Sequence, residues 1–243
     1  MNNVHIIIPA RFESSRLPGK PLKKILGKEM IIRVAEVCKK VIGSKYLHIA
    51  TDNKKILQLV RKKNFNSILT PKSCKTGTDR IAYASKKIKS NIILNVQGDE
   101  PLVKPSDIKK VIQLKKKNPK YVICGYAEIH NKEEVNSPNT IKVVKNKKNE
   151  LIYFSRSKIP ESKNKNNKKF FKQVCIYCFS KKQLEKFSKS KRSLIEKIED
   201  IELLRFLDLD IKIKMCKVSA TTAVDVPSDL KKVEKILKKK FNC

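Results

Sequence analysis

Three cationic side chains, Arg11, Arg16 and Lys20, lie within ten positions, directly after an apolar run at residues 4–10. The run predicts a buried strand, so the loop begins at the carboxyl end of that strand, where open α/β sheets bind ligands. Guanidinium and ammonium groups bind phosphate oxygens, and Gly19 lets the backbone approach a ligand closely. The pattern therefore predicts a polyphosphate site. It is neither a P-loop nor a G-x-G-x-x-G dinucleotide fingerprint.

A second polar segment follows the strongly apolar run at residues 91–96, where Asp99 and Glu100 stand side by side. Mg²⁺ in proteins is usually bound by one or two carboxylates together with substrate phosphate oxygens. Asp225, between Val224 and Pro227, is a candidate second carboxylate from far along the chain. The sequence thus predicts a magnesium site with Asp99 at its centre. A turn or capping role for Asp225 stays open.

The segment from Lys75 to Arg80 reads Lys-Thr-Gly-Thr-Asp-Arg and leads into a predicted helix. A helix start offers backbone N–H groups to an anion, and Arg80 could add its guanidinium to a base or a phosphate. Gly-Thr-Asp is also an ordinary helix start. Both interpretations stay open at this point.

The formal net charge of +34 suggests nucleic acid as a partner, but the composition argues against a specific binder. Only eight of the 57 basic residues are arginine, and the lysines are spread over almost every amphipathic segment. Nucleic-acid binders gather basic residues on one face. We expect no specific nucleic-acid partner, only weak sticking to polyanions.

No run approaches the roughly 20 apolar residues that span a bilayer, and no signal-peptide pattern opens the chain. We therefore expect no membrane partner and a cytoplasmic location. Seven cysteines, an odd number, predict reduced thiols. Cys175 and Cys178 form a lone C-x-x-C in a predicted strand, where positions i and i+3 face opposite sides, so we expect no metal or redox site there.

Strand and helix signals alternate in the first half, which predicts a mainly parallel sheet with helices on both faces. The second half is less regular; it contains a predicted helix at residues 198–207 and a solvated loop at residues 160–169. We find no linker between independent domains. The whole chain, 1–243, is therefore predicted to form a single domain.

Seven motifs occur in order along nearly the whole chain: Ile8-Pro-Ala-Arg11, Arg16-Leu-Pro-Gly-Lys20-Pro-Leu, Ala50-Thr-Asp52, Thr76-Gly-Thr-Asp-Arg80, Asn95-Val-Gln-Gly-Asp-Glu-Pro101, Tyr153-Phe-Ser-Arg156 and Val224-Asp225-x-Pro227. With these motifs the chain resembles the 3-deoxy-manno-octulosonate (Kdo) cytidylyltransferases. The resemblance implies a nucleotide-diphospho-sugar-transferase-like three-layer sandwich with a mainly parallel central sheet and a small β excursion for dimerisation in the second half. About residues 1–130 would bind the nucleotide and about 131–220 the sugar and the second subunit. Residues 221–243 would close the fold with the metal-binding Asp and a helix.

The resemblance also implies a reaction: CMP passes from CTP to the anomeric hydroxyl of Kdo, a 2-keto-3-deoxy sugar acid, with Mg²⁺ as cofactor and a homodimer as the working form. Pyrophosphate leaves, and CMP-Kdo serves lipopolysaccharide biosynthesis. The resemblance assigns catalysis to Arg11, Lys20 and Asp99 and the metal to Asp99 and Asp225. The nucleotide would be bound by Ala10, Arg11, Arg16, Lys20, Thr76, Gly77, Arg80 and Gln97. The sugar would be bound by Gln97, Arg156, Gln173, Tyr177 and Glu202.

Two positions depart from the family pattern, which commonly has His at residue 173 and Gln at residue 203. This chain has Gln173 and Leu203, both expected in the sugar pocket. An acceptor other than Kdo therefore stays open, either 8-amino-Kdo or a nonulosonate related to sialic acid. A basic nucleic-acid-binding protein and a catalytically inactive relative are the alternatives from other classes. The presence of Arg11, Lys20, Asp99 and Asp225 argues against an inactive relative.

Overall fold

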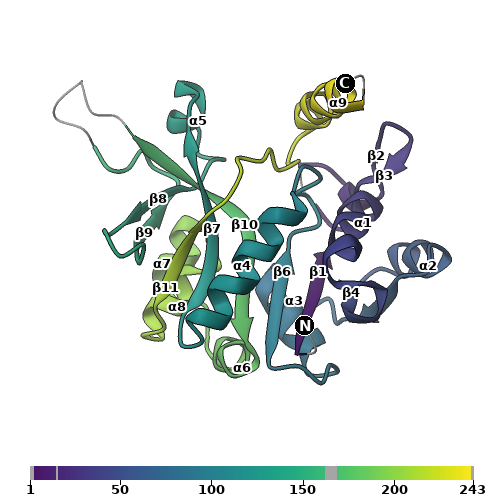
Figure 1. Ribbon diagram of the computed structural model, residues 1–243, viewed down its shortest axis with the longest axis horizontal. Helices are drawn as coiled ribbons and strands as arrows, with labels where there is room; N and C mark the ends of the chain where they lie inside the picture. Colours follow the sequence, from purple (N-terminus) through teal and green to yellow (C-terminus); the bar gives the residue numbers. More distant parts are fainter. Residues whose placement is uncertain (1–2, 15, 162–168, 242–243) are drawn as a thin grey trace.

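The computed structural model describes residues 3–14, 16–161 and 169–241, and the strands of the large sheet form its centre (Figure 1). The order along this sheet is β11-β7-β10-β6-β1-β4-β5; β8 also pairs with β10, and β9 pairs with β8. The strands are β1 (Val4–Ala10), β4 (Leu47–Thr51), β5 (Asn66–Leu69), β6 (Ile92–Val96), β7 (Val122–Ile129), β8 (Lys142–Lys145), β9 (Leu151–Ser155), β10 (Phe170–Ser180) and β11 (Ile213–Lys217).

The sheet is mixed but mainly parallel, as predicted. β1 pairs in parallel with β4 and β6, β4 with β5, and β7 with β11. Only β10 runs antiparallel between β6 and β7 in the main order. β10 therefore joins the strands of the first half to those of the second, and one sheet runs through both.

Helices cover both faces of the sheet, because each face of the buried strands is apolar. On one face the core includes side chains from α1 (Met30–Ile42), α2 (Lys54–Lys62) and α4 (Pro105–Lys117). On the other face it includes side chains from α3 (Gly77–Ser85), α6 (Lys181–Lys189) and α8 (Leu204–Asp208). The predicted three-layer arrangement is confirmed.

The last helix, α9 (Pro227–Phe241), follows a long extended segment after β11 and lies beside the short hairpin of β2 (Lys24–Ile25) and β3 (Lys28–Glu29) (Figure 1). Val233 of α9 is buried in a small separate core with Ile25 and Met30. This packing brings the segment around Asp225 back to the first strand's loop.

The predicted helix at 198–207 is wrong. The structure has two short helices instead, α7 (Leu194–Glu199) and α8, separated at Asp200. Asp200 has a left-handed backbone with φ 48°, which ends α7, and Ile201 beyond it is buried. Aspartate tolerates this conformation better than most residues, so the chain can turn here without glycine. The hairpin and the short helix α5 (Lys132–Asn136) were not predicted.

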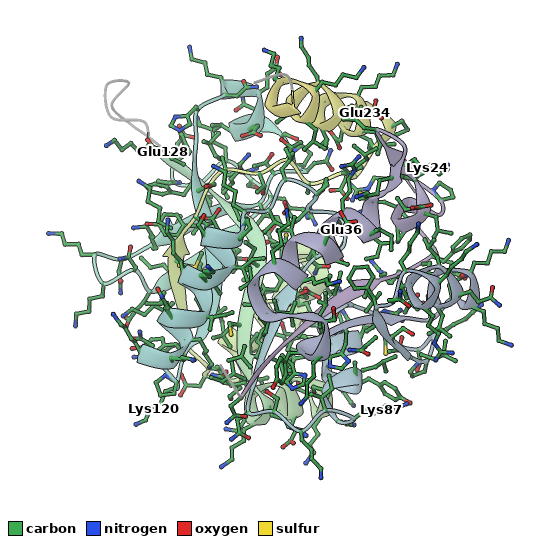
Figure 2. The ribbon with its side chains drawn as sticks, turned by 45° about the vertical axis from the view of Figure 1, so that its right-hand side comes forward. Lys24, Glu36, Lys87, Lys120, Glu128 and Glu234 are labelled. Carbon is green, nitrogen blue, oxygen red and sulfur yellow. The ribbon has the colours of Figure 1, made fainter. Side chains whose placement is uncertain are left out.

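Most of the solvated loop at residues 160–169 lies outside the described part of the chain. In that described part, no helix is long and apolar enough to cross a membrane. Charged side chains project around the whole rim of the molecule, with Lys24, Lys87 and Lys120 on different sides (Figure 2). The expectation about nucleic acids stays a prediction.

Candidate active site

A cleft of about 590 Å³ opens where β1 and β6 end, and it is lined by both halves of the chain. In the parallel pair of β1 and β6, Ile7 lies opposite Asn95, so the segments after Ala10 and Val96 emerge at the same edge of the sheet. The second half contributes residues from β10 and from the segments around α7 and α8. The predicted residues that line the cleft are Ala10, Arg11, Arg16, Lys20, Thr76, Gly77, Gln97, Asp99, Arg156, Gln173, Tyr177, Glu202 and Asp225.

The cationic loop leaves β1 and returns through Gly19, whose φ of 65° is a conformation that glycine adopts readily. Its amide donates to the Phe12 carbonyl at 3.1 Å, which closes the loop. Arg11 and Arg16 are exposed on the loop; Arg11 Nη1 donates to the Lys75 carbonyl at 3.2 Å. The loop therefore presents its guanidinium groups at the mouth of the cleft.

Lys20 lies between two carboxylates that come from distant parts of the sequence. Its Nζ donates to Asp99 Oδ2 at 2.5 Å and to Asp225 Oδ1 at 3.1 Å. Burial works against the ammonium charge, but Asp99 and Asp225 outweigh it and raise the pKa of Lys20. A hydrogen bond of 2.9 Å from the Val224 amide to the Asp99 carbonyl fixes the two segments to each other. Lys20 is thus charged at neutral pH.

The geometry fits the predicted Mg²⁺ ion. Asp99 and Asp225 direct oxygens at one cationic group, Lys20, so both can reach a common cation. Among the described residues, no group of three or more His, Cys, Asp or Glu side chains could hold a metal by itself. Two carboxylates completed by substrate phosphate oxygens are a usual magnesium site.

The start of α3 forms another wall of the cleft. Thr76 caps the helix, with its Oγ1 accepting from the Asp79 amide at 3.1 Å, while Asp79 Oδ2 accepts from the Thr76 amide at 3.0 Å. A Cβ on Gly77 would lie 2.8 Å from Gln97 Nε2, so a larger residue here would displace this amide. Gln97 Nε2 in turn donates to Glu202 Oε1 at 3.3 Å. Gly77, Gln97 and Glu202 therefore meet in one place.

Arg80, predicted to face the nucleotide, does not line the cleft. Its side chain is fully buried behind the wall, where Nη2 donates to Asp52 Oδ2 at 2.7 Å and Nη1 donates to Thr70 Oγ1. In this position the guanidinium ties α3 to the ends of β4 and β5. A direct contact with a nucleotide is not part of this arrangement.

The far end of the cleft contains the residues predicted to bind the sugar. The Arg156 guanidinium donates to the backbone carbonyls of Pro138, Glu199 and Asp200, which fixes its position. Glu202 Oε2 accepts from the Thr78 amide at 2.8 Å. Burial nevertheless raises the pKa of Glu202 above its ordinary value.

Two further predictions concern β10 and α8. Gln173 and Cys175 project from the same face of β10 as Tyr177, and all three line the cleft. Cys178 packs into the opposite core, so the prediction that the two cysteines face opposite sides is confirmed. The prediction that Leu203 lies in the sugar pocket is wrong: Leu203 is fully buried in the core and does not line the cleft.

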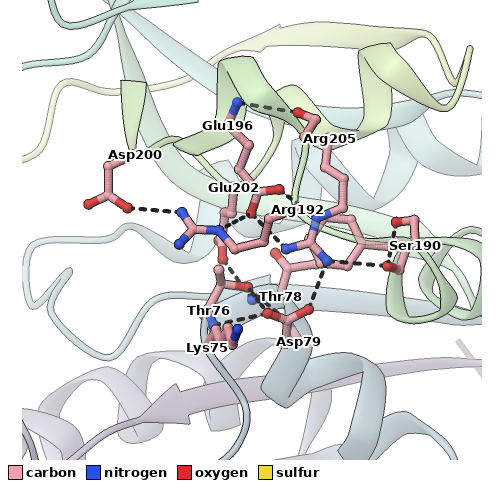
Figure 3. A network of polar contacts seen from close by, with 12 residues as sticks. Lys75, Thr76, Thr78, Asp79, Ser190, Arg192, Glu196, Asp200, Glu202 and Arg205 are labelled. Carbon is pink, nitrogen blue, oxygen red and sulfur yellow. Dashed lines mark hydrogen bonds and ion pairs between the residues drawn. The ribbon is translucent and has the colours of Figure 1, made fainter. Parts of the chain in front are cut away.

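Arg192 and Asp200 also line the cleft, although neither was predicted from the sequence. Arg192 Nε donates to Glu196 Oε1 and Arg192 Nη2 to Asp200 Oδ1, both at 3.2 Å (Figure 3). Glu196 is fully buried and also accepts from Arg205 Nε at 2.7 Å and Nη2 at 2.6 Å. The rarity of arginine in this lysine-rich chain is the signal that could have directed attention to Arg192.

Arg205 connects this corner to the start of α3. Its Nη1 donates to Asp79 Oδ1 at 3.0 Å, while its other nitrogens contact Glu196 (Figure 3). Its guanidinium also stacks 3.7 Å from the ring centroid of Phe187. One buried guanidinium thus positions both the Thr76 wall and the Arg192 wall of the cleft.

Comparison with known proteins agrees with this geometry. The family model described as Cytidylyltransferase matches residues 5–213. The chain belongs to this cytidylyltransferase family. The cytidylyltransferase is 36% identical over 238 residues to 3-deoxy-manno-octulosonate cytidylyltransferase of Escherichia coli, with 98% of this chain and 97% of that protein covered. It is 35% identical over 243 residues to 8-amino-3,8-dideoxy-manno-octulosonate cytidylyltransferase of Shewanella baltica, with 97% of this chain and 98% of that protein covered.

A solved structure supports the same assignment. The cytidylyltransferase superposes with a TM-score of 0.91 on CMP:2-keto-3-deoxy-manno-octonic acid synthetase complexed with CTP, at 36% identity, covering 98% of this chain and 99% of the other. The inositol-1-phosphate CTP transferase from T. maritima shares the fold with a TM-score of 0.72 at 16% identity. The superposition covers 97% of this chain and 95% of the other.

Proposed function

We propose that this cytidylyltransferase transfers CMP from CTP to the anomeric hydroxyl of Kdo and releases pyrophosphate. The observation that carries the proposal is the convergence of Lys20, Asp99 and Asp225 beside the cationic loop, in one cleft. This combination suits a magnesium-bound nucleoside triphosphate. Relatives at 36% and 38% identity that carry the Kdo name support the acceptor.

In the proposed reaction the anomeric oxygen attacks the α-phosphorus in line. A new oxygen–phosphorus bond forms, the bond to the bridging oxygen breaks, the hydroxyl proton leaves to solvent, and pyrophosphate departs. Negative charge grows on the phosphate oxygens, so fixed positive charge and positioning supply most of the catalysis. Lys20 would stabilise this charge from inside the cleft, while Arg11 and Arg16 would bind the outer phosphates from its mouth.

Asp99 and Asp225 are the residues that would hold Mg²⁺. When bound, the ion would neutralise phosphate charge and orient the triphosphate. Thr76, Gly77 and Gln97 would line the nucleotide site, and Arg156, Gln173, Tyr177 and Glu202 would bind the acceptor. Because the reaction consumes CTP, we propose that it takes place in the cytoplasm and supplies CMP-Kdo to lipopolysaccharide biosynthesis.

We also propose that the enzyme is a homodimer. Ile152 on β9 and Leu194 and Ile198 on α7 are 57%, 71% and 73% exposed, unusual values for large aliphatic side chains. Ser155 Oγ donates to Glu199 Oε1 at 2.6 Å, which holds β9 and α7 together. A second copy that presents the same patch would cover these side chains symmetrically.

Pyrophosphate release with CTP and Mg²⁺ tests the function directly. Kdo, 8-amino-Kdo and N-acetylneuraminate would be offered separately to the purified full-length protein. We expect turnover with Kdo. Turnover with 8-amino-Kdo alone would favour the second candidate, which the Shewanella relatives support. Two results together would favour a nucleic-acid-binding protein over an enzyme. The first is that no acid leads to pyrophosphate release, and the second is salt-sensitive RNA binding that the Asp99→Asn variant retains.

A further inference from the structure

Arg192 and Asp200 form an ion pair on the α7 side of the cleft, outside every role assigned so far. The Arg192 side chain is 27% exposed, and that of Asp200 is 78% exposed. Neither residue has a described contact with Lys20, Asp99 or Asp225, the groups beside which the phosphates would lie. The pair therefore belongs to the acceptor end of the cleft.

The pair is held in place by buried groups. Glu196 accepts Arg192 Nε at 3.2 Å and is itself fixed by two hydrogen bonds from Arg205. Asp200 occupies a left-handed backbone conformation that aspartate tolerates better than most residues, and this conformation ends α7 at its position. Its carboxylate lies 3.2 Å from Arg192 and 4.0 Å from Arg156. Both side chains are thus oriented before a substrate binds.

This orientation leaves hydrogen-bonding capacity that faces the cleft. Arg192 uses Nε and Nη2, and within the described residues its Nη1 has no hydrogen-bond partner. The free N–H groups of Nη1 require an acceptor. A hydroxyl oxygen can accept from them, whereas a protonated amine has three donors and no acceptor.

We propose that Arg192, with Asp200, binds the hydroxylated tail of the acceptor sugar acid and selects a terminal hydroxyl over a terminal ammonium group. The inference rests on the proposed function. The acceptor reacts through its anomeric carbon, which also carries the carboxylate, so that end lies beside the α-phosphate. The opposite end of the sugar extends toward the α7 wall, where Arg192 donates to a terminal hydroxyl and Asp200 accepts from one.

The test measures kcat and KM for Kdo, 8-amino-Kdo and CTP with wild-type protein, Arg192→Gln and Lys191→Gln. Lys191 is the matched control, since it is adjacent, exposed, equally charged and outside the cleft lining. In Arg192→Gln, kcat/KM for Kdo should fall about tenfold to hundredfold through the loss of a charge-assisted hydrogen bond. The KM for CTP should stay unchanged, and the preference for Kdo over 8-amino-Kdo should shrink about tenfold.

The fold is expected to survive this substitution, because Arg205 still pairs with Glu196. Asp200→Asn keeps a residue that tolerates the left-handed backbone and should lower kcat/KM for Kdo without changing the melting temperature. A raised KM for CTP with an unchanged acceptor KM in Arg192→Gln would overturn the inference. Equal kinetic constants for Arg192→Gln and Lys191→Gln would also overturn it. A wild-type preference for 8-amino-Kdo would also overturn it. Absence of CMP transfer to either acid by the wild type would instead refute the proposed function, and the inference with it.

Discussion

Lys20 forms ion pairs with both Asp99 and Asp225 and lies beside the proposed triphosphate site. We predict that Lys20→Met lowers kcat by about 10² to 10³, equivalent to roughly 3 to 4 kcal/mol of lost transition-state stabilisation. Pyrophosphate release at saturating CTP and Mg²⁺ measures this loss. Lys24→Met, which removes an exposed lysine on β2, is the control and should retain wild-type turnover. Full activity of Lys20→Met would show that the ammonium group is dispensable.

Arginine usage also carries information at the level of single residues. Most lysines of this chain are at least partly exposed, with Lys115, Lys142 and Lys172 as buried exceptions. In contrast, four of the eight arginines line the cleft: Arg11, Arg16, Arg156 and Arg192. Arg33, Arg80 and Arg205 make hydrogen bonds that fix loops and helices in place. A planar fork of donors suits both tasks, and an ammonium group does not replace it. The residues that the sequence analysis missed could be found by this criterion.

At the level of elements, the predictions succeeded where the apolar signal was long. The strands that end at Ala10 and Val96 are confirmed, because a continuous run of apolar residues defines each of them. The β2–β3 hairpin was missed because its strands have only two residues each, too few for any periodicity. The division between α7 and α8 depends on the left-handed backbone of Asp200 alone. Hydrophobic periodicity, which is read over many residues, does not reveal a change at one position.

The start of α3 is the element that the buried network supports most directly. Asp79 closes the capping box with Thr76 and pairs with Arg205 at 3.0 Å. We predict that Asp79→Ala lowers the free energy of unfolding by about 1 to 3 kcal/mol, since it removes a cap and leaves a buried guanidinium short of a partner. It should also weaken CTP binding through displacement of Thr76.

Urea unfolding and calorimetric titration with CTP measure these two effects. Asp208→Ala, an exposed aspartate at the end of α8, is the control and should change neither quantity. An unchanged unfolding midpoint for Asp79→Ala would contradict the prediction.

The β1–β4 pair contains two neighbouring histidines whose protonation depends on folding. His5 Nδ1 lies 3.0 Å from His48 Nε2, and the two rings stack. Burial, and then the neighbouring His5, lower the pKa of His48 to about 4. The unfolded chain binds a proton near pH 6.5, so between about pH 6.5 and 4 it holds more protons than the folded state. Stability is therefore complete above about pH 6.5 and is lost as the pH falls toward 4.

We predict that the titration of His48 removes about 1 to 2 kcal/mol from the free energy of unfolding between pH 7 and pH 5, after allowance for the partial exposure of the pair. Glu100, whose pKa burial raises to about 7, contributes with the opposite sign over this range, so the His48 contribution is read from the difference between wild type and His48→Asn. Urea unfolding at a series of pH values measures this slope. His48→Asn should flatten it, whereas His130→Gln, at an exposed position, should leave it as in the wild type. A slope that His48→Asn does not change would assign the acid sensitivity to other groups.

For the whole molecule, the exposed patch of Ile152, Leu194 and Ile198 is the surface through which we propose that two copies associate. We predict that the double variant Leu194→Glu, Ile198→Glu is a monomer in light scattering after size exclusion, while the wild type has the mass of two chains. Glutamates placed in a symmetric apolar contact repel each other across the symmetry axis. The contact also loses the favourable free energy of burying the apolar side chains. Lys182→Glu with Lys186→Glu, on α6, introduces the same residues without affecting the patch. A wild-type monomer would refute the dimer proposal.

The position of β10 sets an order of events during synthesis. Within the described residues β7 pairs only with β10 and β11, and both of these strands follow it in the chain. A growing chain that has reached residue 160 therefore holds β6 and β7 with unsatisfied edges and a cleft without its second wall. Such edges pair readily with other chains. We therefore expect the sheet to be completed only once residues 170–180 have been synthesised, since a fragment that ends before them lacks the strand between β6 and β7.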